Sequence, residues 1–340
     1  MTQPPATPPR ATLRDVAEKA GVSRTTASFV LSGRRDMRIS ADAERRVRQA
    51  ARELNYRPSL LARSLRTNLS QTIGLLSDQI ASEMFAGEVI RAALATALRH
   101  EHLLFVGETG GDPEVERSMI QGMIDRGVGG FVYASMYTRA VRVPTTLRKR
   151  PVVLLNSYTR GRRLTTVVPD ETEAGRAVTR ELVANGHRDG IVLVGERTAQ
   201  AVAGQERLDG IRQVLADAGS EPAAVVDCLW WPDHAYRAVR EYLAGGARPT
   251  AFICLNDRVA FGVYQAVQEL GWTVPRDVSV ISFDDSDLAG WLRPPLTSAA
   301  IPYFEMGRLA VELLLATGAT ADLHRVPMPL TLRESVGAPR

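Results

Sequence analysis

The chain has 340 residues, of which 45% are hydrophobic and 24% are charged, so it is long enough to form more than one globular core. It contains no run of about 18 uncharged apolar residues, which excludes a membrane-spanning helix, and its proline-rich start lacks the apolar segment of a secretory signal. Two isolated cysteines, Cys228 and Cys254, predict neither a disulfide framework nor a zinc site. We therefore expect a cytoplasmic protein with no membrane partner.

The charge is distributed unevenly along the chain. Residues 1–71 hold 14 Arg and Lys against 6 Asp and Glu, whereas the remaining residues hold 28 against 32. A basic segment joined to a slightly acidic body predicts a polyanionic partner for the segment alone. A solvated basic face remains an equally good explanation of the charge by itself.

The segment 12–57 predicts three short helices. Thr12 and Asp15 have the spacing of a capping box, apolar residues then recur at helical spacing, and Gly21 supplies a turn. Ser23 and Ser40 are suited to cap a second and a third helix. Two short helices joined by a tight turn form a helix-turn-helix unit, which docks in a DNA major groove.

The part of the chain that begins at Thr72 alternates short apolar runs with amphipathic helical patterns. This alternation predicts an α/β fold in which parallel sheets are covered by helices on both faces. The runs are too many for one small sheet, so we expect two similar subdomains with a ligand cleft between them. The predicted strands are Ile73–Leu76, Leu103–Val106, Phe131–Tyr133, Val152–Leu155, Ile191–Val194, Ala224–Val226, Phe252–Leu255 and Val278–Ile281.

Two N-terminal blocks resemble a known family. TLRDVAEKAGVSRTTAS, which begins at Thr12, and ELNYRP, which begins at Glu53, are similar to the head of the lac repressor (LacI/GalR) family. The similarity continues through the body, from Thr72 to Ser335, most clearly in Gly186-His-Arg, Asn256-Asp, Phe283-Asp-Asp and Pro294-Pro-Leu-Thr. The resemblance implies a helix-turn-helix head, a hinge helix and two doubly wound, periplasmic-binding-protein-like subdomains.

The predicted domains follow from this combination. They are a disordered tail at 1–11, the DNA-binding domain at 12–57, a hinge helix and linker at 58–71, and an effector-binding and dimerisation domain at 72–340. Within the last of these, the N-subdomain takes 72–168 and 301–322, and the C-subdomain takes 169–300 and 323–340.

The resemblance also implies which residues bind DNA. Arg24 and Thr25 begin the second helix, where the family reads base edges, and Arg can donate two hydrogen bonds to guanine; simple phosphate attraction is the alternative for Arg24. Phe29 is a departure, since many members have Arg there; its ring suits a thymine methyl or the core of the head. In the hinge, Leu65 aligns with the wedge that the family inserts into the minor groove, and Ala62 is small enough for two hinges to approach. Hydroxyl side chains suited to phosphates are those of Thr12, Ser23, Thr26, Ser28 and Tyr56.

The resemblance further implies an effector site in the cleft. Carboxylates, amides and an arginine can bind the hydroxyls of a sugar, and an aromatic ring can stack on its apolar face. Arg207 and Asp284 are the main candidates, Asn156 could instead cap a strand, Phe85 could be core, and Trp231 competes with Trp230. The full set is Asp78, Phe85, Ser135, Asn156, Asp170, Arg207, Trp230, Asn256 and Asp284.

Enzyme motifs are lacking. Gly107–Gly111 has neither the Lys-Ser/Thr of a P-loop nor a dinucleotide-binding spacing, no Gly-x-Ser-x-Gly occurs, and the five His show no metal-ligand spacing, so we expect no catalysis, cofactor or metal. The sequence predicts a transcriptional repressor that binds a pseudo-palindromic operator under the control of a small effector, a sugar in our main interpretation. Because only Val336–Arg340 follow the last recognisable block, we expect a homodimer. Two alternatives stay open: a sugar-binding protein, and a corepressor-dependent regulator that responds to a nucleobase or phosphosugar.

Overall fold

The chain divides into two units, Met1–Gln71 and Thr72–Arg340. The computed structural model describes residues 11–31, 39–56, 71–79, 86–161, 163–195, 202–316 and 321–340. Residues 1–10 of the predicted tail, the hinge-helix residues Ala62 and Leu65, and the candidate Phe85 lie outside these ranges. Below, "the head" is the first unit and "the body" is the second.

The head contains three helices, α1 (Leu13–Ala20), α2 (Arg24–Leu31) and α3 (Ala41–Glu53). A capping box begins α1: the backbone N–H of Asp15 donates to Thr12 Oγ1, and the backbone N–H of Thr12 donates to Asp15 Oδ2 at 2.8 Å. Gly21 ends α1 in the left-handed region, with φ 62°, which glycine adopts without strain. The buried core of the three helices consists of Val16, Ala17, Ala20, Ala27, Val30, Val47, Ala50 and Ala51.

The first lobe of the body is a six-stranded sheet in the order β11-β5-β4-β3-β1-β2, and its described pairings are parallel. Alternate residues face opposite sides: Ile73 and Leu75 pack under α5 and α12, whereas Leu76 and Phe131 pack under α6. The elements are β1 (Thr72–Ser77), α5 (Ala86–Arg99), β2 (Leu103–Glu108), α6 (Pro113–Asp125), β3 (Gly130–Ala140), the 3₁₀ turn η1 (Thr145–Leu147), β4 (Val152–Tyr158), β5 (Thr166–Pro169), α12 (Tyr303–Leu315) and β11 (Leu323–Val326).

The second lobe is a six-stranded sheet in the order β12-β10-β9-β8-β6-β7, in which only β12 is antiparallel to its neighbour among the described pairs. In β6, Ile191 and Leu193 face α7 and α8, while Val192 and Val194 face α9 and α10. The elements are α7 (Glu171–Ala184), β6 (Ile191–Val194), α8 (Val202–Asp217), β7 (Ala224–Val226), α9 (Pro232–Ala244), β8 (Ala251–Cys254), α10 (Asp257–Glu269), β9 (Ser279–Asp284), α11 (Asp287–Trp291), β10 (Thr297–Ala300) and β12 (Leu330–Thr331).

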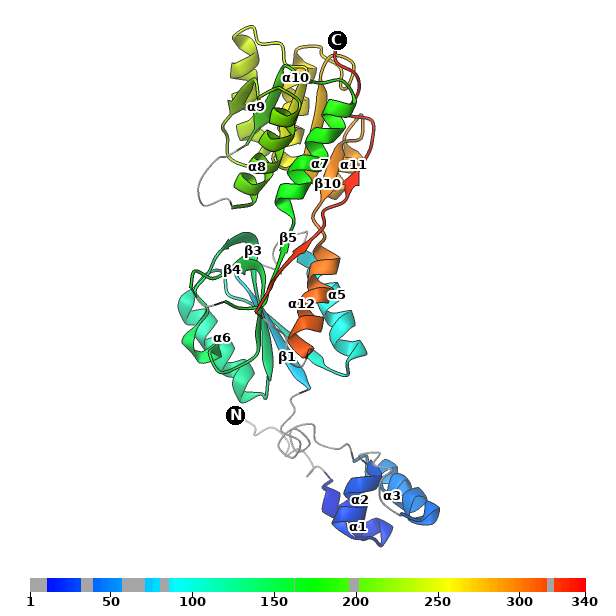
Figure 1. Ribbon diagram of the computed structural model, residues 1–340. Coiled ribbons are helices and arrows are strands. Elements are labelled where there is room, and N and C mark those ends of the chain that lie inside the picture. The colour runs from blue at the N-terminus through cyan, green and yellow to red at the C-terminus, as the bar shows by residue number, and fades with distance from the viewer. Residues whose placement is uncertain are drawn as a thin grey trace, which may run out of the picture. The chain divides into compact units, whose positions relative to one another are not determined.

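The predicted architecture, two helix-covered parallel sheets behind a helix-turn-helix head, is confirmed. The chain passes between the sheets after β5, after β10 and after β11 (Figure 1). One predicted boundary differs from the observed sheets: residues 323–326 were expected in the second subdomain, but β11 pairs with β5 in the first sheet, and β5 itself extends to Pro169. The reason is that β11 is an edge strand whose only buried residue is Val326, so it lacks the apolar run that marks an inner strand.

Candidate functional site

The exposed start of α2 is the first candidate surface. Ser23 precedes the helix, and its Oγ accepts a hydrogen bond from the backbone N–H of Thr26 at 3.0 Å. Arg24 and Thr25 are exposed, and Arg24 forms no ion pair with any carboxylate in the described part of the chain. A free guanidinium beside the N–H groups of a helix terminus favours an anionic or base-edge partner.

The other head candidates are partly engaged. The hydroxyl of Thr12 donates to Asp15 Oδ2 at 2.9 Å, so part of its hydrogen-bonding capacity maintains the cap. Tyr56 packs against the helical core, and burial raises the pKa of its phenol. Ser28 and Phe29 are half-buried on α2, and the described core of the head does not include Phe29. Arg24 and Thr25 therefore remain the most accessible candidates for reading bases.

In the body, the buried guanidinium of Arg207 is the centre of the second candidate site. Arg207 lies on α8 and is only 1% exposed. Its Nε donates to Glu171 Oε2 at 2.6 Å and its Nη2 donates to Glu171 Oε1 at 3.2 Å, while its Nη1 donates to the carbonyl of Leu255. Since a guanidinium has five N–H donors, two remain for another group. Asp284 Oδ1 lies 3.7 Å from Nη2.

Aromatic rings flank this guanidinium. The Arg207 Cζ atom lies 4.6 Å from the ring centroid of Phe283 and 5.5 Å from that of Trp230. The indole Nε1 of Trp230 is buried and donates to no atom in the described residues. Trp231, the competing residue, is instead 52% exposed and its ring lies under Arg258. The geometry therefore places Trp230, and not Trp231, beside Arg207.

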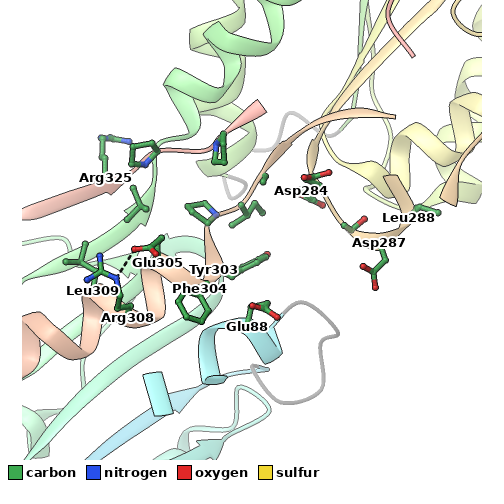
Figure 2. A pocket seen from close by; sticks show the side chains of 18 of the residues that line it. Glu88, Asp284, Asp287, Leu288, Tyr303, Phe304, Glu305, Arg308, Leu309 and Arg325 are labelled. Carbon is green, nitrogen blue, oxygen red and sulfur yellow. Dashed lines mark hydrogen bonds and ion pairs between the residues drawn. The ribbon is translucent and has the colours of Figure 1, made fainter. Parts of the chain in front are cut away.

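Asp284 connects the Arg207 cluster to a large cavity. Burial raises the pKa of Asp284 well above its ordinary value, and the nearby carboxylates of Asp257 and Glu171 raise it further against the effect of Arg207. The cavity has a volume of about 1040 Å³ and includes Asp284 and Tyr303 in its lining. Figure 2 shows Tyr303, at the start of α12, between Asp284, at the end of β9, and Glu88 of α5, and all three line the cavity.

The backbone at the end of β9 is constrained. Asp284 and Asp285 both have positive φ angles, 103° and 48°, which are unfavourable for residues with a Cβ. The turn is held by the backbone N–H of Asp285, which donates to Ser298 Oγ at 3.0 Å, and by an ion pair between Asp285 and Arg333 at 2.7 Å. Backbone strain that the surroundings enforce is typical of a functional site.

Two predicted residues act as helix caps next to the cluster. Asp170 accepts a hydrogen bond from the backbone N–H of Glu173 at the start of α7, and Asn256 accepts one from Val259 at the start of α10. Their chain neighbours, Glu171 and Leu255, are the direct partners of Arg207. The caps therefore position the groups that hold the guanidinium.

The first-lobe candidates form a separate group. Asp78 accepts from the backbone N–H of Met136 at 2.9 Å and forms an ion pair with Arg139 at 2.8 Å. Asn156 donates to the carbonyl of Met136 at 2.8 Å. Ser135 has a buried hydroxyl without a described partner, and with Asp78 it lines a polar cavity of about 220 Å³. No hydrogen bond or ion pair between described residues joins this group to Arg207 or Asp284.

Sequence reasoning missed Glu171 and Tyr303. Glu171 is 2% exposed and directly follows the predicted residue Asp170, so an acidic pair at a helix start was the available signal. Tyr303 follows the second crossing between the lobes, and burial beside Asp284 raises the pKa of its phenol. In the described residues, no group of three or more His, Cys, Asp and Glu could hold a metal ion. None of the described helices has the length and apolarity needed to cross a membrane.

Comparison with known proteins covers both units. Residues 12–59 match the model of bacterial regulatory proteins of the lacI family, and residues 179–336 match the periplasmic binding protein-like domain. The ribose operon repressor of Haemophilus influenzae is 31% identical over 310 residues, covering 90% of this chain and 91% of that protein. The HTH-type transcriptional repressor PurR of Vibrio campbellii is 34% identical over 309 residues, covering 90% and 91%.

Solved structures agree with this pattern. The lac repressor dimer bound to operator and the anti-inducer ONPF superposes with a TM-score of 0.80 at 25% identity, covering 97% of this chain and 100% of that chain. A complex of the transcriptional regulator CelR with cellobiose has a TM-score of 0.64 at 26% identity, covering 96% and 100%.

Proposed function

Because the chain belongs to the lacI family of bacterial regulatory proteins, we propose that it is a repressor whose affinity for its operator is set by a neutral sugar bound at Arg207, Asp284 and Trp230. The family consists of DNA-binding transcriptional regulators and not of enzymes. We propose the effector, the dimer and the residues of each site from the geometry of the described residues.

The observation that carries the effector proposal is the buried Arg207 cluster. Two N–H donors of Arg207 and the indole N–H of Trp230 are left to donate, and the Asp284 carboxyl can accept or donate as its raised pKa allows. Vicinal hydroxyls of a sugar match such a mixture of donors and acceptors, and the Trp230 ring offers a stacking face. CelR in complex with cellobiose is a precedent for a sugar ligand in this fold.

The charge of the Arg207 cluster favours a neutral sugar over a phosphosugar as the effector. The guanidinium of Arg207 already lies against Glu171, at 2.6 Å, and near Asp284, at 3.7 Å. One cation with two carboxyl groups offers no net positive charge to a phosphate, and burying an unpaired dianion is costly. We therefore rank a neutral sugar above a phosphosugar. A nucleobase effector remains the second candidate, because the Trp230 ring would also stack on a base.

The dimer proposal rests on an exposed apolar surface of the first lobe. Leu94 and Leu98 project from α5, and Leu98 is 57% exposed. β2 is the edge strand of its sheet in the described topology, and an exposed apolar edge of this kind favours pairing with another chain. A two-fold dimer would match a pseudo-palindromic operator. The apolar surface consists of Leu94, Leu98, Leu103, Phe105 and Val106.

One experiment tests the proposed function as a whole. Full-length protein is used to select duplexes from a random pool, and the selected duplex is then titrated in gel retardation with neutral sugars, phosphosugars and nucleobases. We expect one preferred, two-fold symmetric sequence and a change in its affinity with a neutral sugar alone. A response only to phosphosugars would refute the charge argument, and binding without sequence preference would refute the regulator itself.

A control separates the dimer from the effector site. Leu98→Glu places a charge on the apolar surface. Leu98 is far from Arg207 in the sequence and does not belong to the proposed effector site. We expect light scattering to report a monomer with weakened operator binding but with unchanged sugar affinity, whereas a dimer of unchanged mass would refute the assignment of this surface.

A further inference from the structure

A buried chain of hydrogen bonds joins three elements of the second lobe. The Oγ atom of Ser298, on β10, donates to Asp257 Oδ1, at the start of α10, at 2.8 Å. The same Oγ accepts from the backbone N–H of Asp285, directly after β9, at 3.0 Å. Ser298 is 0% exposed and Asp257 is 1% exposed, so water does not compete for the bond between them. We call these three groups the serine relay.

The direction of the serine relay follows from its donors. Since a backbone N–H can only donate, Ser298 must accept from Asp285, which leaves its own proton for Asp257. Asp257 also binds Ser286, whose backbone N–H and Oγ both donate to Asp257 Oδ2 at 2.8 Å. The carboxyl group of Asp257 therefore holds the turn after β9 at two points, once through Ser298 and once through Ser286.

The serine relay acts on a backbone segment with an unfavourable conformation. Asp284 and Asp285 both have positive φ angles, 103° and 48°. A residue with a Cβ keeps such an angle where its surroundings enforce it. The side chain of Asp285 has partners of its own in Thr331 and Arg333, but its backbone N–H donates to Ser298. Loss of the Ser298 hydroxyl would leave that N–H without its acceptor beside strained backbone.

The position of this turn sets the position of the Asp284 carboxyl group. Asp284 Oδ1 lies 3.7 Å from Arg207 Nη2 in the proposed effector site. Among the described residues, none donates a hydrogen bond to that carboxyl group. Its place beside Arg207 therefore depends on the backbone that carries it, and that backbone is held at the next residue by Ser298.

We propose that Ser298 is a positioning residue of the effector site, which holds the strained turn after β9 so that the Asp284 carboxyl group faces Arg207. This inference rests on the proposed function, because it takes Asp284 as a residue that binds the effector. Ser298 acts through Asp285 and not by contact with the effector, since it is fully buried and does not line the cavity beside Asp284.

A second buried serine provides a matched control. Ser335 is also 0% exposed, and its Oγ accepts from the backbone N–H of Thr297 and donates to the carbonyl of Val280, at 2.8 Å and 2.6 Å. It thus connects β9 and β10 near their amino ends, away from Asp284. Ser298→Ala and Ser335→Ala each remove one buried hydroxyl without a change of charge. Each should lower the Tm of the full-length protein by about 5 °C.

Sugar affinity and crystal structures separate the two variants. The probes are D-ribose and cellobiose, chosen because a ribose operon repressor and a cellobiose complex are among the similar proteins. For the probe that the wild-type protein binds, calorimetric titration should show about tenfold weaker binding by Ser298→Ala and wild-type affinity for Ser335→Ala. Ser298→Thr, which keeps the hydroxyl, should bind as the wild type does. Crystal structures should show Asp284 displaced from Arg207 by about 1 Å in Ser298→Ala alone.

The outcomes distinguish this inference from the proposed function. Weaker binding and a displaced Asp284 in Ser298→Ala, with neither change in Ser335→Ala, support the inference. Equal losses of affinity in the two alanine variants overturn it, as does a Ser298→Ala structure in which Asp284 keeps its place and its φ angle. A Ser298→Thr protein that melts at the wild-type temperature but binds as weakly as Ser298→Ala also overturns it. If the wild-type protein binds neither probe, the proposed function fails for these sugars, and the position of Asp284 in the crystal structures decides the role of Ser298.

Discussion

Replacing Arg207 by Met should damage both the fold and the sensing of the effector. The change keeps much of the side-chain volume but leaves the Glu171 carboxylate, which is 2% exposed, without its partner. Breaking one side of a buried ion pair costs about 3–5 kcal/mol, because the remaining charge stays buried. For a domain of this size, that corresponds to a fall in Tm of about 10 °C.

A second variant separates the two effects. Glu171→Gln combined with Arg207→Met removes both charges, and most of the lost stability should return since replacing a whole buried pair is often close to neutral. Calorimetry of the full-length protein at one fixed concentration gives Tm, and gel retardation with sugar gives the response. We expect the double variant to bind operator and to ignore the sugar. A single variant that melts at the wild-type temperature, or a double variant that responds normally, would refute the reasoning.

Three further predictions concern single side chains. Trp230→Ala should weaken sugar affinity at least about tenfold in calorimetric titration, whereas Trp231→Ala should not, and equal losses would contradict the placement of Trp230. Burial lowers the pKa of His187 below 6.5, so the unfolded chain binds more protons than the folded chain, and the body loses stability as pH falls through 6.5. His187→Gln should flatten that part of a curve of Tm against pH. An unaltered curve would exclude His187 as the cause. Arg24→Ala should reduce discrimination at one operator base pair by about 1–3 kcal/mol, and a uniform loss over all duplexes would instead indicate a phosphate contact.

The strands that the sequence predicted well are those with continuous apolar runs. β6 and β7 have the predicted bounds, and β1, β2 and β4 extend the predicted runs by two or three residues, whereas β3 extends from the predicted Phe131–Tyr133 to Gly130–Ala140. β5, β10 and β11 were missed for a common reason: none has a run of large apolar residues. Thr297–Ala300 is almost fully buried although it reads TSAA, because Ser298 donates its hydroxyl to Asp257 at 2.8 Å. A hydrogen bond between residues far apart in sequence leaves no local signal.

The effector cluster could be predicted only in part, for a chemical reason. Side chains that cap helices are the same Asp and Asn types that bind sugars, so the sequence could not distinguish Asp170 and Asn256 as caps from direct ligands. It also could not choose between Trp230 and Trp231, because that choice depends on which ring packs over Arg207. For Glu171 the acidic pair with Asp170 was a signal in the sequence, but its role as the partner of Arg207 follows only from the structure.

The crossings between the lobes explain how an effector at Arg207 would act at a distance. Glu171 begins α7 just after the first crossing, and Tyr303 begins α12 just after the second, where the backbone N–H of Ile301 donates to the carbonyl of Asp284 at 3.3 Å. Helix α12 packs closely on α5: a Cβ on Gly307 would lie 2.5 Å from the Val89 carbonyl oxygen. A ligand that favours one position of Tyr303 would therefore also favour one position of α5 and of the apolar surface on it. A ligand shifts the populations of two such positions only if its affinity for them differs. A sugar that binds Arg207 without contacting the crossings should therefore bind tightly but leave operator affinity unchanged.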